Sequence, residues 1–162
     1  MDSKLHNSPE TFDNIRAFLM NNFVGTLATV GPENSPHASV MYFTASTDLT
    51  LRFLTKKDTR KSRNLEHNPK VSFVVFEAHS QTVVTIEGEA IDITDTEEAN
   101  PVFNELLKIV ENNSESGIPP ISTLIDAGRY VAYSIKPKQI RMANFSHPNH
   151  GGYDQFEILN FE

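Results

Sequence analysis

Positively charged side chains gather in one short stretch of this sequence. The 162-residue chain has 14 Lys and Arg residues, and half of them lie between residues 52 and 70, where Asp58 and Glu66 are the only acids. The seven are Arg52, Lys56, Lys57, Arg60, Lys61, Arg63 and Lys70. The stretch spans a predicted junction of strand and helix, where unpaired backbone N–H groups and the helix dipole favour an anion. The cluster predicts a phosphate site, and a solvated helix face is the other interpretation of the pattern.

Two hydroxyl side chains, Thr55 and Thr59, lie at the same junction and add the hydrogen-bond donors that suit a compact phosphate site. Nucleic acid is disfavoured as the ligand, because the net charge of −7 opposes it and no alternation of basic and aromatic residues accompanies the cluster. The sequence therefore favours one phosphorylated small molecule.

Other reactive groups are few. The chain has no cysteine, which excludes disulfides, thiolate zinc sites, iron–sulfur clusters and thiol nucleophiles. His147 and His150 with Asp154 lie in a predicted loop without a second ligand pair, so we expect no metal site. Haem is disfavoured because no histidine is evident in an apolar pocket, with His79 as the remaining candidate ligand. No catalytic side chain is identified.

The composition is that of an ordinary folded domain, with 38% hydrophobic, 22% charged and 9% aromatic residues. Its length predicts a single domain over residues 1–162. The first fifteen residues do not have the pattern of a signal peptide, and no window approaches 18 consecutive apolar residues. We therefore expect a cytoplasmic protein with no membrane partner.

The first half of the sequence predicts helices and strands that flank the basic cluster. Ser8 and Pro9 begin a predicted amphipathic helix over residues 9–22. Alternating and β-branched residues, separated by Gly, Pro, Asn, Asp and Ser, predict an antiparallel meander, and Asp58 is the predicted cap of the next helix. The predicted strands are 24–30, 37–45 and 49–55, and the second helix covers 58–67.

The second half adds more strands and one amphipathic helix. A helix capped by Thr94 or Asp95 carries an apolar stripe over residues 99–110. The predicted strands are 70–76, 82–93 with Gly88 as a bulge, 129–135, 139–145 and an edge strand over 156–161. Short strands with few helices favour a mainly β fold, namely a small barrel with peripheral helices, with a sandwich as the alternative.

Several segments together resemble the family of FMN-binding split barrels related to pyridoxamine 5'-phosphate oxidase, in its branch of general stress proteins and flavin reductases. No gap in spacing is needed between residues 39 and 88. The matching segments are Gly25 to Phe43, Phe53-Leu54-Thr55, Thr59-Arg60-Lys61, Asn68-Pro69-Lys70-Val71-Ser72 and Thr82 to Gly88.

The resemblance implies a six-stranded antiparallel split β-barrel with two or three peripheral helices, and a homodimer with FMN between the subunits. By that resemblance, Arg60 and Lys61 bind the FMN phosphate, helped by Leu54, Thr55 and Lys57. The edge of the isoalloxazine ring is then lined by Ser39, Val40, Met41, Tyr42 and Phe43. Thr82 and Val83 match the strand position that reaches the flavin or its phosphate.

Three positions depart from the authentic oxidase, which has arginine, lysine and glutamine where this chain has Ser39, Thr44 and Val83. The stretch Ile140–Phe145 also lacks the family's substrate-gripping motif. The resemblance thus implies an FMN-dependent oxidoreductase acting on a small molecule, and not pyridoxamine 5'-phosphate oxidase itself. The alternative is a non-catalytic protein that binds flavin or haem as a sensor or carrier.

Overall fold

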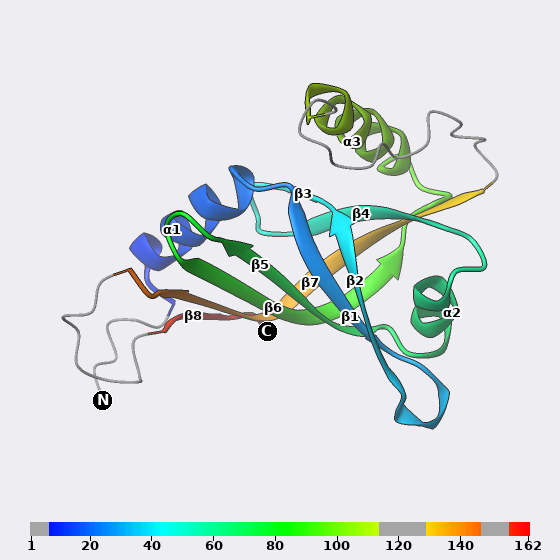
Figure 1. Ribbon diagram of the computed structural model, residues 1–162, viewed down its shortest axis with the longest axis horizontal. Coiled ribbons are helices and arrows are strands. Elements are labelled where there is room, and N and C mark those ends of the chain that lie inside the picture. Colours follow the sequence, from blue (N-terminus) through cyan, green and yellow to red (C-terminus); the bar gives the residue numbers. More distant parts are fainter. Residues whose placement is uncertain (1–6, 114–128, 147–155) are drawn as a thin grey trace.

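The computed structural model describes residues 7–113, 129–146 and 156–162. Within these ranges, three helices lie around a curled sheet, with α1 and α2 towards opposite ends of the sheet and α3 above it (Figure 1). The helices are α1 (Pro9–Met20), α2 (Arg60–His67) and α3 (Ala99–Asn113), and a single 3-10 turn covers Pro32–Asn34.

In the described part of the chain, eight strands form one sheet in the order β2-β1-β5-β6-β7-β4-β3, with β8 pairing β7 beside this path. Every pair is antiparallel. The strands are β1 (Val24–Val30), β2 (Pro36–Tyr42), β3 (Thr44–Ala45), β4 (Leu51–Lys56), β5 (Lys70–Glu77), β6 (Thr82–Asp92), β7 (Tyr130–Asn144) and β8 (Glu157–Asn160). Six strands are long and two, β3 and β8, are short additions, so the predicted mainly β split barrel is confirmed.

The sheet curls until its two ends meet. The strand predicted over residues 37–45 breaks at Phe43, whose N–H donates to the carbonyl of Phe23 at 2.9 Å. On one side of this break the chain belongs to β2, and on the other to β3, although β2 and β3 lie at opposite ends of the strand order. β2 and β4 are therefore in contact without pairing as a ladder, and this missing ladder is the split in the barrel.

The barrel interior is a single apolar core. Its largest fully buried side chains include Phe43, Phe53 and Phe73, and α1 contributes Ile15 and Leu19 to the same cluster. A second cluster lies on the outer surface of the sheet beneath α3. Its buried members are Leu54, Ile93, Ala99, Val102, Leu106, Tyr130 and Ala132.

Local hydrogen bonds explain where the helices begin. The hydroxyl of Ser8 accepts the N–H of Thr11 at 3.0 Å, as expected from the sequence. The prediction that Asp58 caps α2 is wrong, because Asp58 adopts a left-handed conformation (φ 63°) and the hydroxyl of Thr59 accepts the N–H of Ser62. The helix accordingly begins at Arg60, and α1 ends at Met20 instead of residue 22.

The predicted caps of α3 are also wrong, because the helix begins at Ala99. Thr94 instead binds the neighbouring strand, where its hydroxyl accepts the N–H of Ala132 at 3.0 Å. The loop predicted over residues 112–120 lies mostly outside the described residues.

The strands predicted over residues 129–135 and 139–145 are one continuous strand, β7. Lys136-Pro137 resembled a turn in the sequence, because proline lacks the N–H that a strand ladder uses. Pro137 nevertheless lies inside β7, and the chain does not turn there.

Pro137 lies opposite Gly88, at the bulge that the sequence predicted there. A Cβ on Gly88 would be 2.2 Å from the carbonyl oxygen of Lys136, so only glycine fits. On the other side of β7, pairing with β4 stops at Ile135 and pairing with β8 starts at Gln139. On this side of β7, Pro137 therefore lies between the residues that pair with β4 and those that pair with β8, where no N–H is needed for pairing.

Candidate functional site

The corner where β4 leads into α2 holds a tight group of hydroxyls. Thr55 is only 4% exposed, and its Oγ1 lies 3.3 Å from Oγ1 of Thr59. The Thr59 hydroxyl also donates to the carbonyl of Lys56 at 3.0 Å, which fixes the turn. Because Thr59 caps α2, the first N–H groups of the helix are presented at this corner, as the sequence analysis anticipated.

Two cations begin α2 at the same corner. Arg60 is exposed, whereas Lys61 is half-buried, and burial lowers the pKa of the Lys61 ammonium. Within the described residues neither side chain forms an ion pair. Two unneutralised cations beside a buried hydroxyl and a helix N-terminus make a favourable place for a phosphate.

Further positive charge surrounds the turn. Lys56 and Lys57 are exposed, and the N–H of Lys57 donates to the carbonyl of Arg129 at 2.8 Å. Arg63 is exposed, and its Nη1 donates to the backbone carbonyl of Asp58 at 2.6 Å. The corner thus keeps five of the seven cations that the sequence analysis counted.

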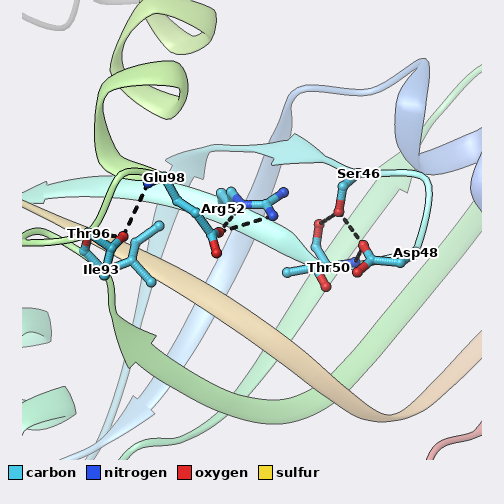
Figure 2. A network of polar contacts seen from close by, with 7 residues as sticks. All are labelled: Ser46, Asp48, Thr50, Arg52, Ile93, Thr96 and Glu98. Carbon is cyan, nitrogen blue, oxygen red and sulfur yellow. Dashed lines mark hydrogen bonds and ion pairs between the residues drawn. The ribbon is translucent and has the colours of Figure 1, made fainter.

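The other two cations have different surroundings. Arg52 is bound by Glu98, with its Nε and Nη2 both 3.2 Å from Oε2 of that carboxylate. Figure 2 shows this pair joining β4 to the segment before α3. Lys70, at the start of β5, lines a separate cavity of about 520 Å³ together with Glu89 and Lys138. The ion pair of Arg52 fastens α3 over the outer face of β4.

The predicted ring-lining residues lie on β2 and just after it, beside the split. Met41 and Phe43 point into the barrel and are 8% and 0% exposed, whereas Val40 points outwards and is 71% exposed. Tyr42 also points outwards, stacks on Phe23 with ring centroids 6.4 Å apart, and packs against the cluster beneath α3 to which Leu54 belongs. The outer face of β2 thus offers both an exposed and a sheltered apolar surface.

Ser39 carries an unsatisfied polar atom. Its position alternates with that of Val40, so its side chain lies on the same side of β2 as buried Met41. Its Oγ is buried without a hydrogen-bond partner, and is the one such side-chain atom in the described part of the chain. A buried hydroxyl without a partner is costly, so a ligand that bonds it gains affinity.

Thr82 and Val83 lie far from the corner within one chain. Thr55 pairs with Val131 near the start of β7, whereas Thr82 pairs with Asn144 at its end, so thirteen residues of β7 separate them. At about 3.3 Å per residue this is roughly 40 Å along the strand. The Thr82 hydroxyl bonds Ser80 Oγ at 3.0 Å and Asn144 Nδ2 at 3.1 Å. One chain therefore does not bring the two halves of the predicted site together.

A sequence profile of the family described as pyridoxamine 5'-phosphate oxidase matches residues 11–144. The chain belongs to this family. The match covers most of the chain, including both halves of the predicted site, so the family expected from the sequence is confirmed.

Named relatives agree with this family. A pyridoxine/pyridoxamine 5'-phosphate oxidase of Burkholderia mallei is 31% identical over 78 residues, which are 48% of this chain and 36% of that protein. The matched part of the chain thus spans about a third of the length of the relative. A putative pyridoxamine 5'-phosphate oxidase from Listeria innocua is 28% identical, with a TM-score of 0.62 over 82% of this chain and 98% of the other.

A haem-binding protein from Mycobacterium smegmatis has the same fold. Its TM-score is 0.69 at 21% identity, covering 94% of this chain and 59% of the other. This likeness extends to the fold alone.

Within residues 7–113, 129–146 and 156–162, no three His, Asp or Glu side chains come together as metal ligands; His147, His150 and Asp154 lie outside these ranges. In the same described part of the chain, no helix is long and apolar enough to span a membrane.

Proposed function

We propose that this protein binds FMN and uses it to transfer electrons to or from a small molecule. The observation that carries the proposal is the corner between β4 and α2. There the buried Thr55 hydroxyl, the capped start of α2 and the unpaired cations Arg60 and Lys61 fit a phosphate monoester. Membership of the family supports FMN as the molecule that carries this phosphate.

In this proposal each residue has a defined task. Arg60 and Lys61 balance the phosphate charge, while Thr55 and the N–H groups of α2 bind its oxygens. The Ser39 hydroxyl gains the partner that it lacks in the protein alone. Lys57 adds positive charge at the turn, and Leu54 supplies apolar contact beside the phosphate.

The open edge of β2 suits the rim of a flavin ring. β2 pairs with β1 on one side, and in the strand order it has no neighbour on the other. Alternate backbone N–H and C=O groups between Ser39 and Phe43 therefore face the split, where they can bond the polar rim of the ring. When bound, FMN supplies the hydride and electron chemistry, and the protein orients it and excludes water.

The proposal includes a homodimer. The outer faces of β2, β5 and β6 carry exposed apolar side chains, among them Val40 (71% exposed) and Phe76 (59% exposed). Phe76 pairs with Val83 across β5 and β6. A second copy packed on this face would cover the apolar side chains and bring its own Thr82 and Val83 towards the ring.

The substrate is proposed to differ from that of pyridoxamine 5'-phosphate oxidase. Thr44 stands where the resemblance gives that oxidase a lysine for its substrate, and this threonine is only 4% exposed. The position thus offers neither a cation nor an accessible side chain. A small organic acceptor, or a reduced nicotinamide or deazaflavin donor, fits the proposal better than a vitamin B6 phosphate.

The test is to mix the purified protein with FMN, desalt it, and record the visible absorption spectrum and the molecular mass in solution. We expect retained flavin bands with one FMN per chain, on a dimer. A colourless monomer would overturn the proposal, and a haem-like band after exposure to haem would replace it with the carrier function.

Anaerobic addition of NADH, NADPH or a reduced deazaflavin then separates an enzyme from a binding protein. Bleaching of the flavin by one of them supports an oxidoreductase. Retained FMN that none of them reduces, and that no added acceptor reoxidises after chemical reduction, would identify a flavin-binding protein without turnover.

A further inference from the structure

More positive charge surrounds the corner than a flavin phosphate needs. A phosphate monoester carries about −1.5 to −2 charges at neutral pH. Arg60 and Lys61 already balance it. Of the other three cations, Lys57 adds charge to the FMN site proposed above, and Lys56 and Arg63 remain. Both are exposed in a protein whose net charge is −7.

These two cations are held to one turn. The carbonyl of Lys56 accepts the Thr59 hydroxyl at 3.0 Å, and Arg63 Nη1 donates to the Asp58 carbonyl at 2.6 Å. The turn itself is fixed, because Asp58 adopts a φ of 63° and Lys57 N–H donates to Arg129 O at 2.8 Å. The guanidinium of Arg63 is therefore fixed at the turn, and the backbone of Lys56, whose side chain is exposed, is fixed beside it.

Within the described residues, no carboxylate forms an ion pair with Lys56 or Arg63. The described ion pairs involve Arg16 with Asp13, Arg52 with Glu98, and Lys138 with Glu89. Asp58 and Glu66 are the acids of the segment itself, and within the described residues neither forms an ion pair with Lys56 or Arg63. Exposed cations without acidic partners in an acidic protein form a local attractor for anions.

We propose that Lys56 and Arg63 bind a second anionic molecule, the redox partner of the flavin, through two or more phosphate or carboxylate groups. The proposal rests on the FMN site proposed above and extends it to the class of partner. Because the rest of the protein repels anions, a polyanionic partner is steered to this corner. An elongated molecule anchored here reaches along β4 and β2 towards the ring end of the site with its reactive part.

The test uses the FMN-loaded protein and two simple probes, inorganic tripolyphosphate and citrate, with binding measured by calorimetry. The variant Lys56→Gln/Arg63→Gln removes the two cations. The matched control Lys108→Gln/Lys136→Gln removes two exposed charges from α3 and β7. We expect the first variant to bind the preferred probe about tenfold more weakly than the control, because each exposed ion pair contributes a small amount.

Wild-type affinity is expected to fall steeply with added salt. Preference for tripolyphosphate would indicate a phosphorylated partner such as a dinucleotide, and preference for citrate a polycarboxylate. The FMN content of each variant, read from its absorption spectrum, separates this proposal from the one on which it rests.

Three results would overturn the inference. The wild-type protein could bind neither probe, the two variants could bind equally well, or the probes could bind only by displacing FMN. If the protein retained no FMN at all, the proposed function would fail first, and the polyanion site with it.

Discussion

The polar groups at the two ends of β7 differ in whether they have partners within the protein. Near Val131, the corner of β4 and α2 presents cations without carboxylate partners and a nearly buried threonine, Thr55. Near Asn144, polar groups pair with one another: Thr82 bonds Ser80 and Asn144, and the Glu77 carboxylate accepts two backbone N–H groups. At the first end, hydrogen-bonding groups and cations are left over for a ligand, whereas at the second end the polar side chains bond one another within the chain.

This difference distinguishes two threonines that were both predicted to lie at the cofactor. Thr55 and Thr82 are both nearly buried threonines on strands, and the resemblance placed both at the cofactor. The surroundings distinguish them, because only the Thr55 hydroxyl lies beside unpaired cations and a helix N-terminus. Buried polar groups whose hydrogen bonds are complete contribute to stability, whereas a buried polar group without a partner is costly until a ligand or water bonds it.

The largest expected effect is at the corner. Arg60→Ala/Lys61→Ala should weaken FMN binding by about 3 to 6 kcal/mol, since a charge-assisted phosphate bond contributes about 1.5–3 kcal/mol. The measurement is a fluorescence titration of FMN, with Lys108→Ala/Lys136→Ala as the charge-matched control. Equal affinity in the two variants would remove the corner from the binding site.

At the end of β7 near Asn144, a substitution should change the stability of the protein. Thr82→Val keeps the shape of the side chain and deletes the hydroxyl that joins Ser80 and Asn144, so the protein without cofactor should lose about 1 to 2 kcal/mol of unfolding free energy. Urea denaturation measures it. Wild-type stability in this variant would contradict the structural role of the hydroxyl.

Ser39→Ala should weaken FMN binding without lowering stability. Removing a buried hydroxyl without a partner should leave the unfolding free energy of the cofactor-free protein unchanged or raise it by up to about 1 kcal/mol, while FMN affinity falls about fivefold. The pair of measurements compares directly with Thr82→Val. A destabilised Ser39→Ala with normal FMN affinity would mean that the hydroxyl belongs to the fold.

The smallest expected effect is on the pH dependence of stability, through Glu77 near the end of β7. Hydrogen bonds from Ser80 and then from the His79 N–H lower the pKa of Glu77 to about 2. Because the folded pKa is depressed, the stabilising contribution is present above the ordinary value of 4.5 and is lost as pH falls towards 2.

Glu77→Gln should therefore flatten the stability profile between pH 2 and about 5, as followed by thermal unfolding. Glu97→Gln, at an exposed position before α3, is the control. A Glu77→Gln profile as steep as that of the control variant would count against the capped turn.

The fold could largely be predicted because its signals are local. The cap at Ser8, the bulge at Gly88 and the alternating strands follow from short-range rules of sterics and hydrogen bonding. The errors at the strands arose where distant partners decide the conformation. Pro137 stays within a strand because of where its neighbours β4 and β8 stop, and Phe43 breaks a strand because the sheet curls there.

The site was predictable where charge density marked it. The cluster that includes Arg60 and Lys61 is visible in the sequence. That Arg52 instead forms an ion pair with Glu98 could not be predicted, because the two residues are 46 positions apart. The unsatisfied hydroxyl of Ser39 has no signal in the sequence, because satisfaction depends on what packs nearby. The separation of Thr82 from Thr55 likewise follows from the register of β7.

The most direct test of the central claim is a crystal structure of the FMN-loaded protein. We predict phosphate oxygens within about 3 Å of Thr55 Oγ1, the Arg60 guanidinium and Lys61 Nζ, with the ring along β2. A phosphate bound elsewhere, with the corner occupied only by solvent, would contradict the account.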